Sequence, residues 1–580
     1  LKQAGMDTVT FGRGVRPVGF DNEIQENGNY ESPYSEMMWE SPDGTKIFGI
    51  LFANWYNNGN EVPTDKKSAK EYWDDRLKKV ATFASTDEYL LMNGCDHQPV
   101  QADLGKAIEV ASELYPDINF KHSNFPDYIK AIKEKVPNDL AVVKGELTSQ
   151  DTDGWSTLIN CASSHIYLKQ MNRKCESALE NGAEPVRVLS SVLGQNYPSD
   201  ELEYSWKKLM QNHPHDSICC CSVDEVQDEM ATRFNKSKQV ADYLVSEGTR
   251  YIADKINTKE YEKYKNALPF VVFNTTGRKR TSVVSVEIDV TRKSGWLKKC
   301  AYDLDEINVP NYKLIDSAGN SIPFKIEDLG VRFGYDLPKD KFRQPYMARR
   351  VRVTFEAENK SAVGYKTYAL VEGDAEKVTD TLVSGENCME NDAIRVEINK
   401  NGSLNVTDKA SGRTYKGVAY YEETGDLGNE YMYKMPEGSK AITTQDTVAK
   451  IELAEDEPYR AMYKITNTIT VPKSGDDNFE DEKRHMVFFK ERVGGRSNDT
   501  VEMKIETFVS LDKNGKGVKI KTRFDNEVKD HRVRIMVPTG INSDVHKADS
   551  VFEVVTRNNR HNAGWNNPSG CEHEQGFVSI

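Results

Sequence analysis

The sequence predicts a multidomain α/β, α and β protein: a partial parallel α/β layer, a three-helix-type bundle and then a large antiparallel β-sandwich region. The length of 580 residues exceeds what one hydrophobic core supports. The spacing of apolar residues also changes twice along the chain, near residues 150 and 265. We therefore expect domains at residues 1–150, 151–265 and 266–580, the last of them truncated at its C-terminus.

In the first region, short apolar runs alternate with amphipathic stretches. The runs typical of buried strands are residues 8–11, 47–52, 89–92 and 140–143, and the stretches typical of helices are residues 104–115 and 128–135. This alternation predicts a mostly parallel sheet, in which ligands bind beyond the carboxyl ends of the strands. The loops expected there contain Arg13, Trp55, Tyr56 and Asp96. Aromatic rings stack on sugar faces and carboxylates bond hydroxyls, so the loops are interpreted as a polyol pocket.

In the second region, two helical segments are joined by Gln211-Asn-His-Pro-His-Asp-Ser-Ile-Cys-Cys-Cys221. Ser222 and Glu225 have the spacing of a capping box, which predicts that the next helix starts there. The dense polar groups fit either a capped turn with a satisfied histidine or a metal or sugar site. In the second interpretation His215 is a ligand and Asp216 a hydrogen-bond acceptor.

From about residue 266 onward, apolar and polar residues alternate with period two, which predicts one or two antiparallel sandwiches. Asn401-Gly402 separates two alternating runs and predicts a hairpin. The acidic stretch at residues 476–482 is interpreted as a solvated loop.

Composition narrows the possible partners and compartment. The net charge of −14 disfavours nucleic acid and anionic membranes as partners, and no apolar run of about 18 residues occurs. Nine cysteines, three of them consecutive, predict mostly free thiols in a reducing compartment, and we expect a cytoplasmic protein.

Taken together, these motifs resemble glycoside hydrolase family 38, the zinc-dependent α-mannosidases, and most closely its bacterial members. His213-Pro-His-Asp-Ser-Ile, followed by Ser-Val-Asp-Glu, is similar to the family's histidine-aspartate motif, and Met92-Asn-Gly-Cys-Asp-His-Gln is similar to its Gly-x-Asp loop. Glu36-Met-Met-Trp39 and Asn54-Trp-Tyr-Asn57 also fit. The resemblance covers essentially the whole chain. It implies a retaining hydrolase of terminal α-linked mannose in oligosaccharides or glycans, acting through a covalent glycosyl-enzyme, with one zinc ion per complete active site.

The resemblance also implies roles for individual residues. Asp96 matches the general acid/base, whose protonation burial beside Cys95 and aromatic neighbours would favour. His215 matches a zinc ligand, and Asp216 matches the residue that bonds the sugar hydroxyls beside it.

Four more residues are expected to contact the substrate or the catalytic nucleophile. Arg13 resembles the arginine that contacts the nucleophile, and Trp55 or Tyr56 would form the aromatic wall of the sugar subsite. Tyr431, in the sandwich region, resembles the element that reaches toward the site.

Two departures from the family pattern lead to further expectations. The first zinc histidine and aspartate and the nucleophile are expected upstream of Leu1, so this fragment alone is predicted to bind zinc poorly and to be inactive. Cys220 stands where the family usually has glycine, and at positive φ a cysteine costs about 1 kcal/mol.

Other functions remain open from the sequence. A related enzyme that hydrolyses mannosylglycerate or another small α-mannoside would share the same sugar pocket. A protein of another class, a non-catalytic carbohydrate-binding protein, is favoured by the large sandwich and the missing nucleophile. A homo-oligomer is possible, since family members often assemble.

Overall fold

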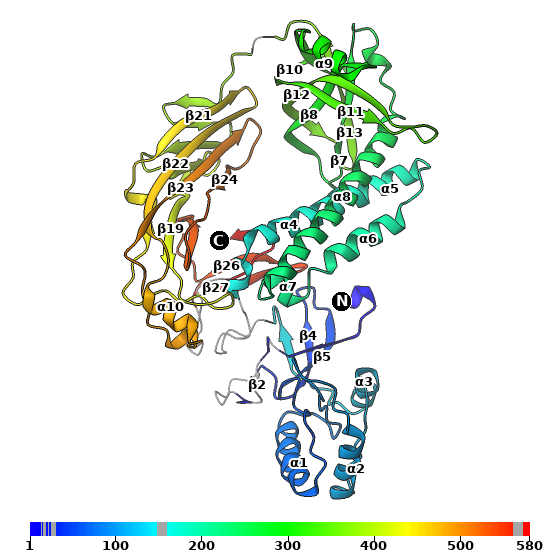
Figure 1. Cartoon of the computed structure of the whole chain (residues 1–580), viewed down its shortest axis with the longest axis vertical. Helices are drawn as coiled ribbons and strands as arrows, with labels where there is room; N and C mark the ends of the chain where they lie inside the picture. Colours follow the sequence, from blue (N-terminus) through cyan, green and yellow to red (C-terminus); the bar gives the residue numbers. More distant parts are fainter. Residues whose placement is uncertain are drawn as a thin grey trace. The chain divides into compact units, whose positions relative to one another are not determined.

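The computed structural model describes residues 1–12, 14–15, 19–20, 23–24, 31–147, 159–376, 378–560 and 572–580. The chain divides into two compact units, which are described separately (Figure 1). The first unit combines Leu1–Cys161 with Ile541–Ile580, and the second is Ala162–Gly540. The multidomain class expected from the sequence, α/β followed by helices and antiparallel sheets, is confirmed. In the described chain, every helix is too short or too polar to cross a membrane.

A four-stranded sheet organises the first unit. Its order is β1 (Thr8–Phe11), β5 (Lys46–Leu51), β4 (Glu36–Glu40) and β6 (Val142–Lys144). β1 pairs with β5, and β4 with β6, in parallel, while β4 and β5 are antiparallel. The mostly parallel layer is thus confirmed. Phe11 pairs with Leu51, so the segments that follow β1 and β5 leave the sheet at the same edge.

Three helices belong to this unit: α1 (Lys66–Ala81), α2 (Leu104–Leu114) and α3 (Phe125–Lys133). The predicted strand at residues 89–92 is wrong, because the backbone there is irregular. The helix α1 was not predicted. It begins at Asp65, whose side chain accepts from the Ser68 amide, and it buries Trp73 against Ala107 of α2.

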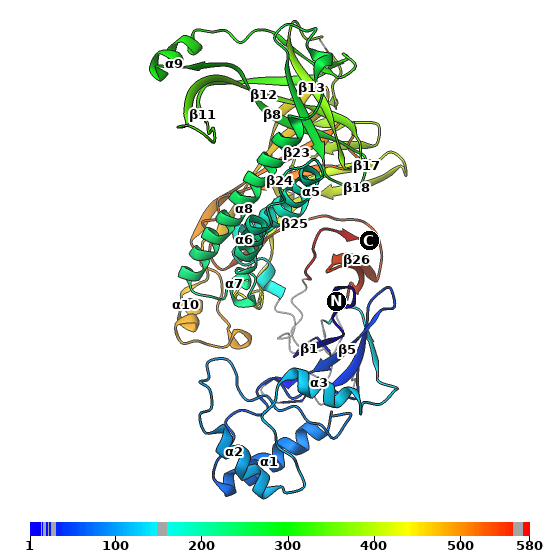
Figure 2. The same ribbon diagram turned by 90° about the vertical axis from the view of Figure 1, so that its right-hand side faces the viewer.

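A helical bundle opens the second unit. It contains α4 (Ile166–Ala178), α5 (Glu184–Val192), α6 (Ser199–Met210), the short α7 (His215–Cys219) and α8 (Asp224–Ala253). Figure 2 shows α6 lying alongside α8, with α7 at the end of the pair. Leu209, Met230 and Phe234 are fully buried between these helices. The capping-box prediction is wrong, because α8 is capped at Val223 and the buried Ser222 hydroxyl has no partner among the described residues.

The rest of the second unit consists mainly of antiparallel sheets. One is ordered β10-β9-β13-β7 and another β11-β12-β8; their strands are β7 (Leu268–Asn274), β8 (Arg280–Ser294), β9 (Tyr312–Asp316), β10 (Ser321–Ile322), β11 (Phe324–Asp336), β12 (Gln344–Lys360) and β13 (Gly364–Glu372). The helix α9 (Leu297–Asp305) packs on β12.

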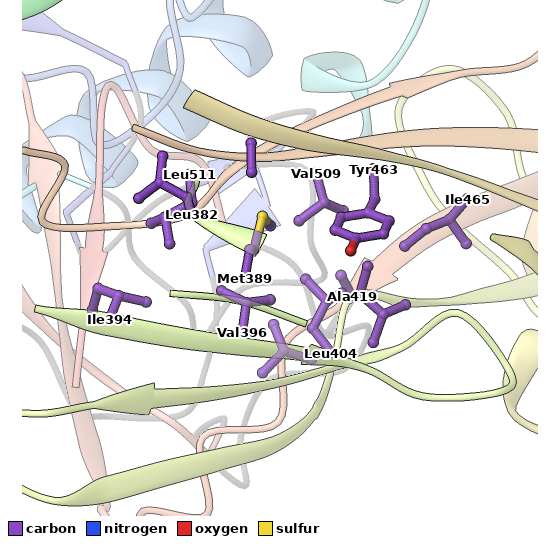
Figure 3. Packing of buried hydrophobic residues seen from close by; sticks show 13 residues of the cluster. Leu382, Met389, Ile394, Val396, Leu404, Ala419, Tyr463, Ile465, Val509 and Leu511 are labelled. Atoms are coloured by element: carbon purple, nitrogen blue, oxygen red, sulfur yellow. The ribbon is translucent and has the colours of Figure 1, made fainter. Parts of the chain in front are cut away.

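A sandwich core lies between two further sheets (Figure 3). One contains β14 (Val383–Gly385), β15 (Cys388–Glu390), β16 (Ile394–Ile398), β17 (Leu404–Asp408) and β18 (Arg413–Val418); the other contains β21 (Lys450–Glu457), β22 (Arg460–Pro472), β23 (Thr500–Asp512) and β24 (Lys519–Arg523). Val396 and Leu404 face Ile465 and Val509 across this core. The predicted hairpin is confirmed, since Gly402 has φ +84° between β16 and β17.

Smaller elements complete the chain. Another sheet of the second unit is ordered β20-β19-β25, from β19 (Tyr420–Gly425), β20 (Ile442–Thr443) and β25 (His531–Met536). The acidic stretch expected to be a loop forms the helix α10 (Asp477–Arg484), capped by Asp476. In the first unit, β26 (Val545–Ser550) pairs with β27 (Glu553–Asn558) and β28 (Val578–Ser579).

Candidate active site

The loop that follows β5 carries two of the predicted residues, Trp55 and Tyr56. Their rings are stacked, with centroids 4.8 Å apart. Trp55 is buried and has φ +68°, a left-handed conformation that is rare for a bulky aromatic residue. Backbone strain of this kind persists only where the surroundings hold it, and it is concentrated at functional sites. The surrounding residues therefore hold this loop in a specific conformation.

A second loop is tied to the first through the Asn58 side chain. Its Nδ2 donates to the Leu90 carbonyl at 3.0 Å, and its Oδ1 accepts from the Met92 amide at 2.8 Å. The Gly59 amide donates to the Met92 carbonyl at 2.9 Å. A Cβ on Gly59 would lie only 3.0 Å from the Leu91 carbonyl carbon, so a larger residue would displace the Leu91 backbone by a few tenths of an ångström. These bonds take the place of the strand pairing predicted from the apolar run at residues 89–92.

The joined loops bring Asp96 to Tyr56. The Tyr56 hydroxyl donates to Asp96 Oδ2 at 3.2 Å. Asp96 is exposed, so the predicted burial beside Cys95 is wrong. An exposed carboxyl held beside two stacked aromatic rings is nevertheless an arrangement that suits sugar binding. The rings offer flat apolar faces to a sugar, and the carboxyl can exchange a proton with a bound ligand.

Beneath the first loop lies a cavity of about 30 Å³ that contains a buried carboxylate. Glu36 is 1% exposed; its Oε2 accepts from the Ser85 amide at 2.9 Å and its Oε1 from the Tyr128 hydroxyl at 3.2 Å. Burial, reinforced by the Glu36 charge, raises the pKa of Tyr128. The Asn54 Nδ2 lines the same cavity and has no partner among the described residues. The sequence shows Glu36 in a motif but gives no role to it.

In the second unit, His215 and Asp216 lie on the first turn of α7 and are 87% and 71% exposed. His215 Nε2 lies 3.5 Å from Asp216 Oδ1. The connection is fixed by buried amides: Asn212 Nδ2 donates to the Met230 carbonyl at 3.0 Å, and Gln227 Nε2 donates to the Ser222 carbonyl at 2.9 Å. The loop therefore presents two polar side chains on a backbone anchored to α8.

The neighbouring histidine takes a different position. His213 Nε2 hydrogen-bonds Asn172 Oδ1 of α4 at 2.8 Å. This contact matches the satisfied-histidine interpretation for His213, although both His213 and His215 are exposed.

Cys220 ends α7 in the left-handed conformation, with φ +65° and ψ +31°. Its amide donates to the Ser217 carbonyl at 3.0 Å, and its side chain is buried with Sγ 3.2 Å from Lys169 Nζ. The positive φ considered from the sequence is thus present at this position.

The turn at Cys220 directs Cys221 back over α7, where it contacts Asp216. Cys221 Sγ donates to Asp216 Oδ1 at 3.3 Å. Burial is the main cause that raises the pKa of both the Tyr431 hydroxyl and the Cys221 thiol. Asp216 is therefore bonded by a cysteine that sequence reasoning did not select.

The remaining predicted residue, Arg13, lies outside the described residues. The others form two groups, one in each unit. Trp55, Tyr56 and Asp96 belong to the first unit, and the second unit contains His215, Asp216 and Tyr431. None of the eight cysteines within the described ranges forms a disulfide.

Whether these residues can hold a zinc ion depends on the number and type of their donor atoms. Zinc sites have three or four protein ligands drawn from His, Cys, Asp and Glu. Across the described ranges, no group of three such side chains is arranged to hold a metal ion. His215 with Asp216 provides two donors, so the described residues do not form a complete zinc site.

Four family models match the chain in succession. They are the glycosyl hydrolases family 38 N-terminal domain over residues 1–156, the alpha mannosidase middle domain over 156–252, the glycosyl hydrolases family 38 C-terminal domain 1 over 265–372, and the glycosyl hydrolases family 38 C-terminal domain over 389–579. Because the N-terminal domain model is matched, the expectation that the chain lacks the N-terminal catalytic segment is not supported, and the predicted inactivity loses its basis.

Individual proteins agree with the family models. A putative mannosylglycerate hydrolase from Halalkalibacterium halodurans is 42% identical over the whole chain, which spans 65% of that protein's length. The structure of an alpha-mannosidase from Enterococcus faecalis V583 is 43% identical, with a TM-score of 0.95 over the whole chain and 64% of its own.

A second Enterococcus faecalis structure, of a protein in glycosyl hydrolase family 38, is 38% identical with a TM-score of 0.83 over 96% of this chain and 61% of its own. With the matches in sequence, fold and domain order, the chain belongs to glycosyl hydrolase family 38.

Proposed function

We propose that this protein hydrolyses α-mannosides. The observation that carries the proposal is the contact between Tyr56 and Asp96 beside the ring of Trp55. A glycosidase needs a carboxyl that gives a proton to the leaving oxygen and a surface that holds the sugar ring. Stacked aromatic rings next to an exposed carboxyl supply both in one place, at the edge where β1 and β5 end.

Asp96 is proposed as the general acid and base. Tyr56 donates to Oδ2, which leaves Oδ1 as the oxygen proposed to carry the proton to the departing group. In the second step of a retaining reaction the same carboxylate takes a proton from water. Retention of configuration is proposed from the family, and measurement of the anomer first formed from a mannoside tests it.

A zinc ion is also proposed as cofactor, with His215 as one of its ligands and Asp216 as the residue that bonds the sugar hydroxyls. The support is the family resemblance and the exposed imidazole on an anchored loop. The metal would hold neighbouring hydroxyls of the sugar when bound. Metal analysis of the purified protein tests this part, with His215→Ala as the variant expected to lose zinc.

Two substrate classes fit the proposed sugar pocket. One is α-linked mannose at the end of an oligosaccharide or glycan, and the other is mannosylglycerate, which the name of the Halalkalibacterium relative suggests. They share the mannose and differ only in the leaving group. The sugar pocket built around Trp55 and Tyr56 therefore suits either, and activity must separate them.

The test is hydrolysis by the purified protein of three compounds: an aryl α-D-mannoside, an α-linked mannobiose and mannosylglycerate. Each is assayed with added zinc and with a chelator. Chelator-sensitive release of mannose is the expected result, with release from the mannobiose and mannosylglycerate lost in Asp96→Asn, and the preferred natural compound identifies the substrate class. Binding of methyl α-mannoside without hydrolysis of any compound would instead establish the non-catalytic carbohydrate-binding alternative.

A further inference from the structure

The carboxyl group of Glu36 lies at the base of the loop that carries Trp55. Glu36 is the first residue of β4 and pairs with Ile50, close to the end of β5 from which this loop leaves the sheet. Its two oxygens accept one hydrogen bond each, from the Ser85 amide and the Tyr128 hydroxyl. Each carboxyl oxygen has a second lone pair, so the group can accept further hydrogen bonds.

The cavity beside this carboxyl reaches both loops of the candidate site. Trp55 and Asn58 line it from the first loop, and Leu90 and Met92 line it from the second. Its volume of about 30 Å³ holds roughly one or two water molecules and is far too small for a sugar. A molecule bound in the cavity therefore lies between the residues that shape both loops.

Two buried polar atoms favour water as the molecule bound there. Asn54 lines the cavity, is 6% exposed, and its Nδ2 has no hydrogen-bond partner among the described residues. The hydroxyl of Ser85, the residue whose amide bonds Glu36, is also buried without a partner in that part of the chain. Such groups are costly to bury unless they are bonded, and an internal water with two to four polar partners satisfies them. A metal cation is disfavoured, because cations need acceptor ligands and the Asn54 Nδ2 is a donor.

The residue that follows Asn54 has the strained backbone. Trp55 has φ +68°, and its amide donates to the Phe52 carbonyl at 2.8 Å. A left-handed conformation at a bulky aromatic residue persists only where surrounding contacts hold it. A water that bonds the Asn54 side chain and the Glu36 carboxyl would tie this turn to the neighbouring strand.

We propose that Glu36 and Asn54 bind an internal water in this cavity, and that the water bridge holds the Trp55 turn in the conformation that receives a mannoside. The inference rests on the proposed function, in which Trp55 belongs to the wall of the sugar pocket. Glu36 and Asn54 are positioning residues, because they act on the sugar only through this turn. Loss of the bridge weakens sugar binding and leaves the chemical step at Asp96 nearly unchanged.

Crystallography of the wild-type protein tests the water directly. We expect ordered density about 3 Å from both Asn54 Nδ2 and a carboxyl oxygen of Glu36, and no such density in Asn54→Leu. Crystals grown in rubidium chloride distinguish water from a cation, because bound rubidium gives an anomalous signal. A wild-type cavity without density, or with an anomalous peak, overturns the proposal.

The second experiment compares KM and kcat for an aryl α-D-mannoside in a double-mutant cycle. Asn54→Ala should raise KM about 3- to 10-fold, with kcat changed less than about twofold. Glu36→Met removes both acceptor oxygens, so in that background Asn54→Ala should raise KM less than about twofold. Glu88→Gln is the matched control, because Glu88 lines the same cavity but accepts from Lys135 in an exposed pair. In the control background the full effect of Asn54→Ala should remain.

Hydrogen exchange reports the conformation of the turn without turnover. The Trp55 amide should exchange several-fold faster in Asn54→Ala and in Glu36→Met than in the wild type. In Glu88→Gln it should exchange at the wild-type rate.

The outcomes separate this inference from the proposed function. An equal effect of Asn54→Ala on KM with and without Glu36→Met, or unchanged exchange of the Trp55 amide in Asn54→Ala, overturns the positioning role. An ordered water and faster exchange in both variants, in a protein that neither binds nor hydrolyses a mannoside, would establish the water bridge and overturn the proposed function.

Discussion

The Asp96 carboxyl and its contact with Tyr56 lead to a kinetic prediction. Asp96→Asn removes the proton that the leaving oxygen needs, so kcat/KM for an alkyl mannoside should fall about 100-fold or more. A leaving group of low pKa departs with little protonation, so an activated aryl mannoside should lose much less. Asp117→Asn is the control, since Asp117 is an exposed aspartate of the same unit. Equal losses for both leaving groups would show that Asp96 binds or orients the substrate and is not its acid.

A second residue-scale prediction concerns Cys220, whose φ of +65° suits glycine. Cys220→Ala and Cys220→Gly both remove the thiol and its contact with Lys169, so their difference isolates the backbone conformation. The glycine variant should be more stable than the alanine variant by about 1 kcal/mol, since glycine adopts positive φ without strain. Thermal unfolding should show this as a midpoint roughly 2 °C higher. An alanine variant as stable as the glycine variant would mean that this turn is not left-handed in solution.

Sequence reasoning selected residues that stand in recognisable motifs and missed those whose role depends on distant partners. His215, Asp216 and Asp96 stand out by type and spacing. Glu36 is bonded by Tyr128, 92 positions away, and by the Ser85 amide, 49 positions away. Nothing local in the sequence signals such contacts, because they depend on how separate elements pack.

At the scale of elements, the irregular segment at residues 89–92 shows why an apolar run is weak evidence for a strand. Its backbone groups bond to the side chain of Asn58 and the backbone of Gly59, so they take no part in the sheet. Strand and loop leave the same apolar pattern when either is half-buried. The helix α10 shows that an acidic stretch is equally weak evidence for a loop. Glu482 of this stretch is buried and accepts from the Val493 amide.

Asn58 holds the two loops of the candidate site together, and its removal tests that role. Asn58→Ala leaves the Leu90 carbonyl and the Met92 amide without their partner, at a cost of about 2 kcal/mol or more. The loop with Asp96 should then loosen, and kcat should fall. Asn58→Asp keeps the acceptor for Met92 and should behave in between. Hydrogen exchange of the Met92 amide provides the check, and unchanged protection in Asn58→Ala would exclude this role.

At the scale of the whole molecule, the order of the layers could be predicted from sequence because each layer has its own apolar period. The antiparallel pairing of β16 with β17 likewise follows from the turn between them. The apolar periodicity of residues 541–580 does not indicate which unit the strands of this segment join. That depends on an ion pair between Glu146 and Arg557, 411 positions apart, together with the Ser550 hydroxyl.

This ion pair makes the attachment of residues 541–580 to the rest of the first unit depend on pH. Arg557 Nε and Nη2 donate to the two carboxylate oxygens of Glu146 at 2.8 and 2.7 Å, and the side chains are only 7% and 12% exposed. Burial alone would raise the pKa of Glu146, but the hydrogen bonds from Arg557 and Ser550 outweigh it and lower this pKa below its ordinary value of 4.5. The pair therefore contributes its full stability above about pH 4.5 and loses it as the pH falls through the folded-state pKa.

Glu146→Gln should remove this dependence and destabilise the first unit by about 3 kcal/mol, because it leaves the buried Arg557 guanidinium without its counter-charge. Lys70→Met breaks an exposed pair with Asp74 in the same unit and should leave stability nearly unchanged. Hydrogen exchange of peptides from β26 and β27 should increase in Glu146→Gln at pH 7, and in the wild type only at acidic pH. If exchange in these strands is the same in both proteins at pH 7, the ion pair does not hold residues 541–580 to the first unit.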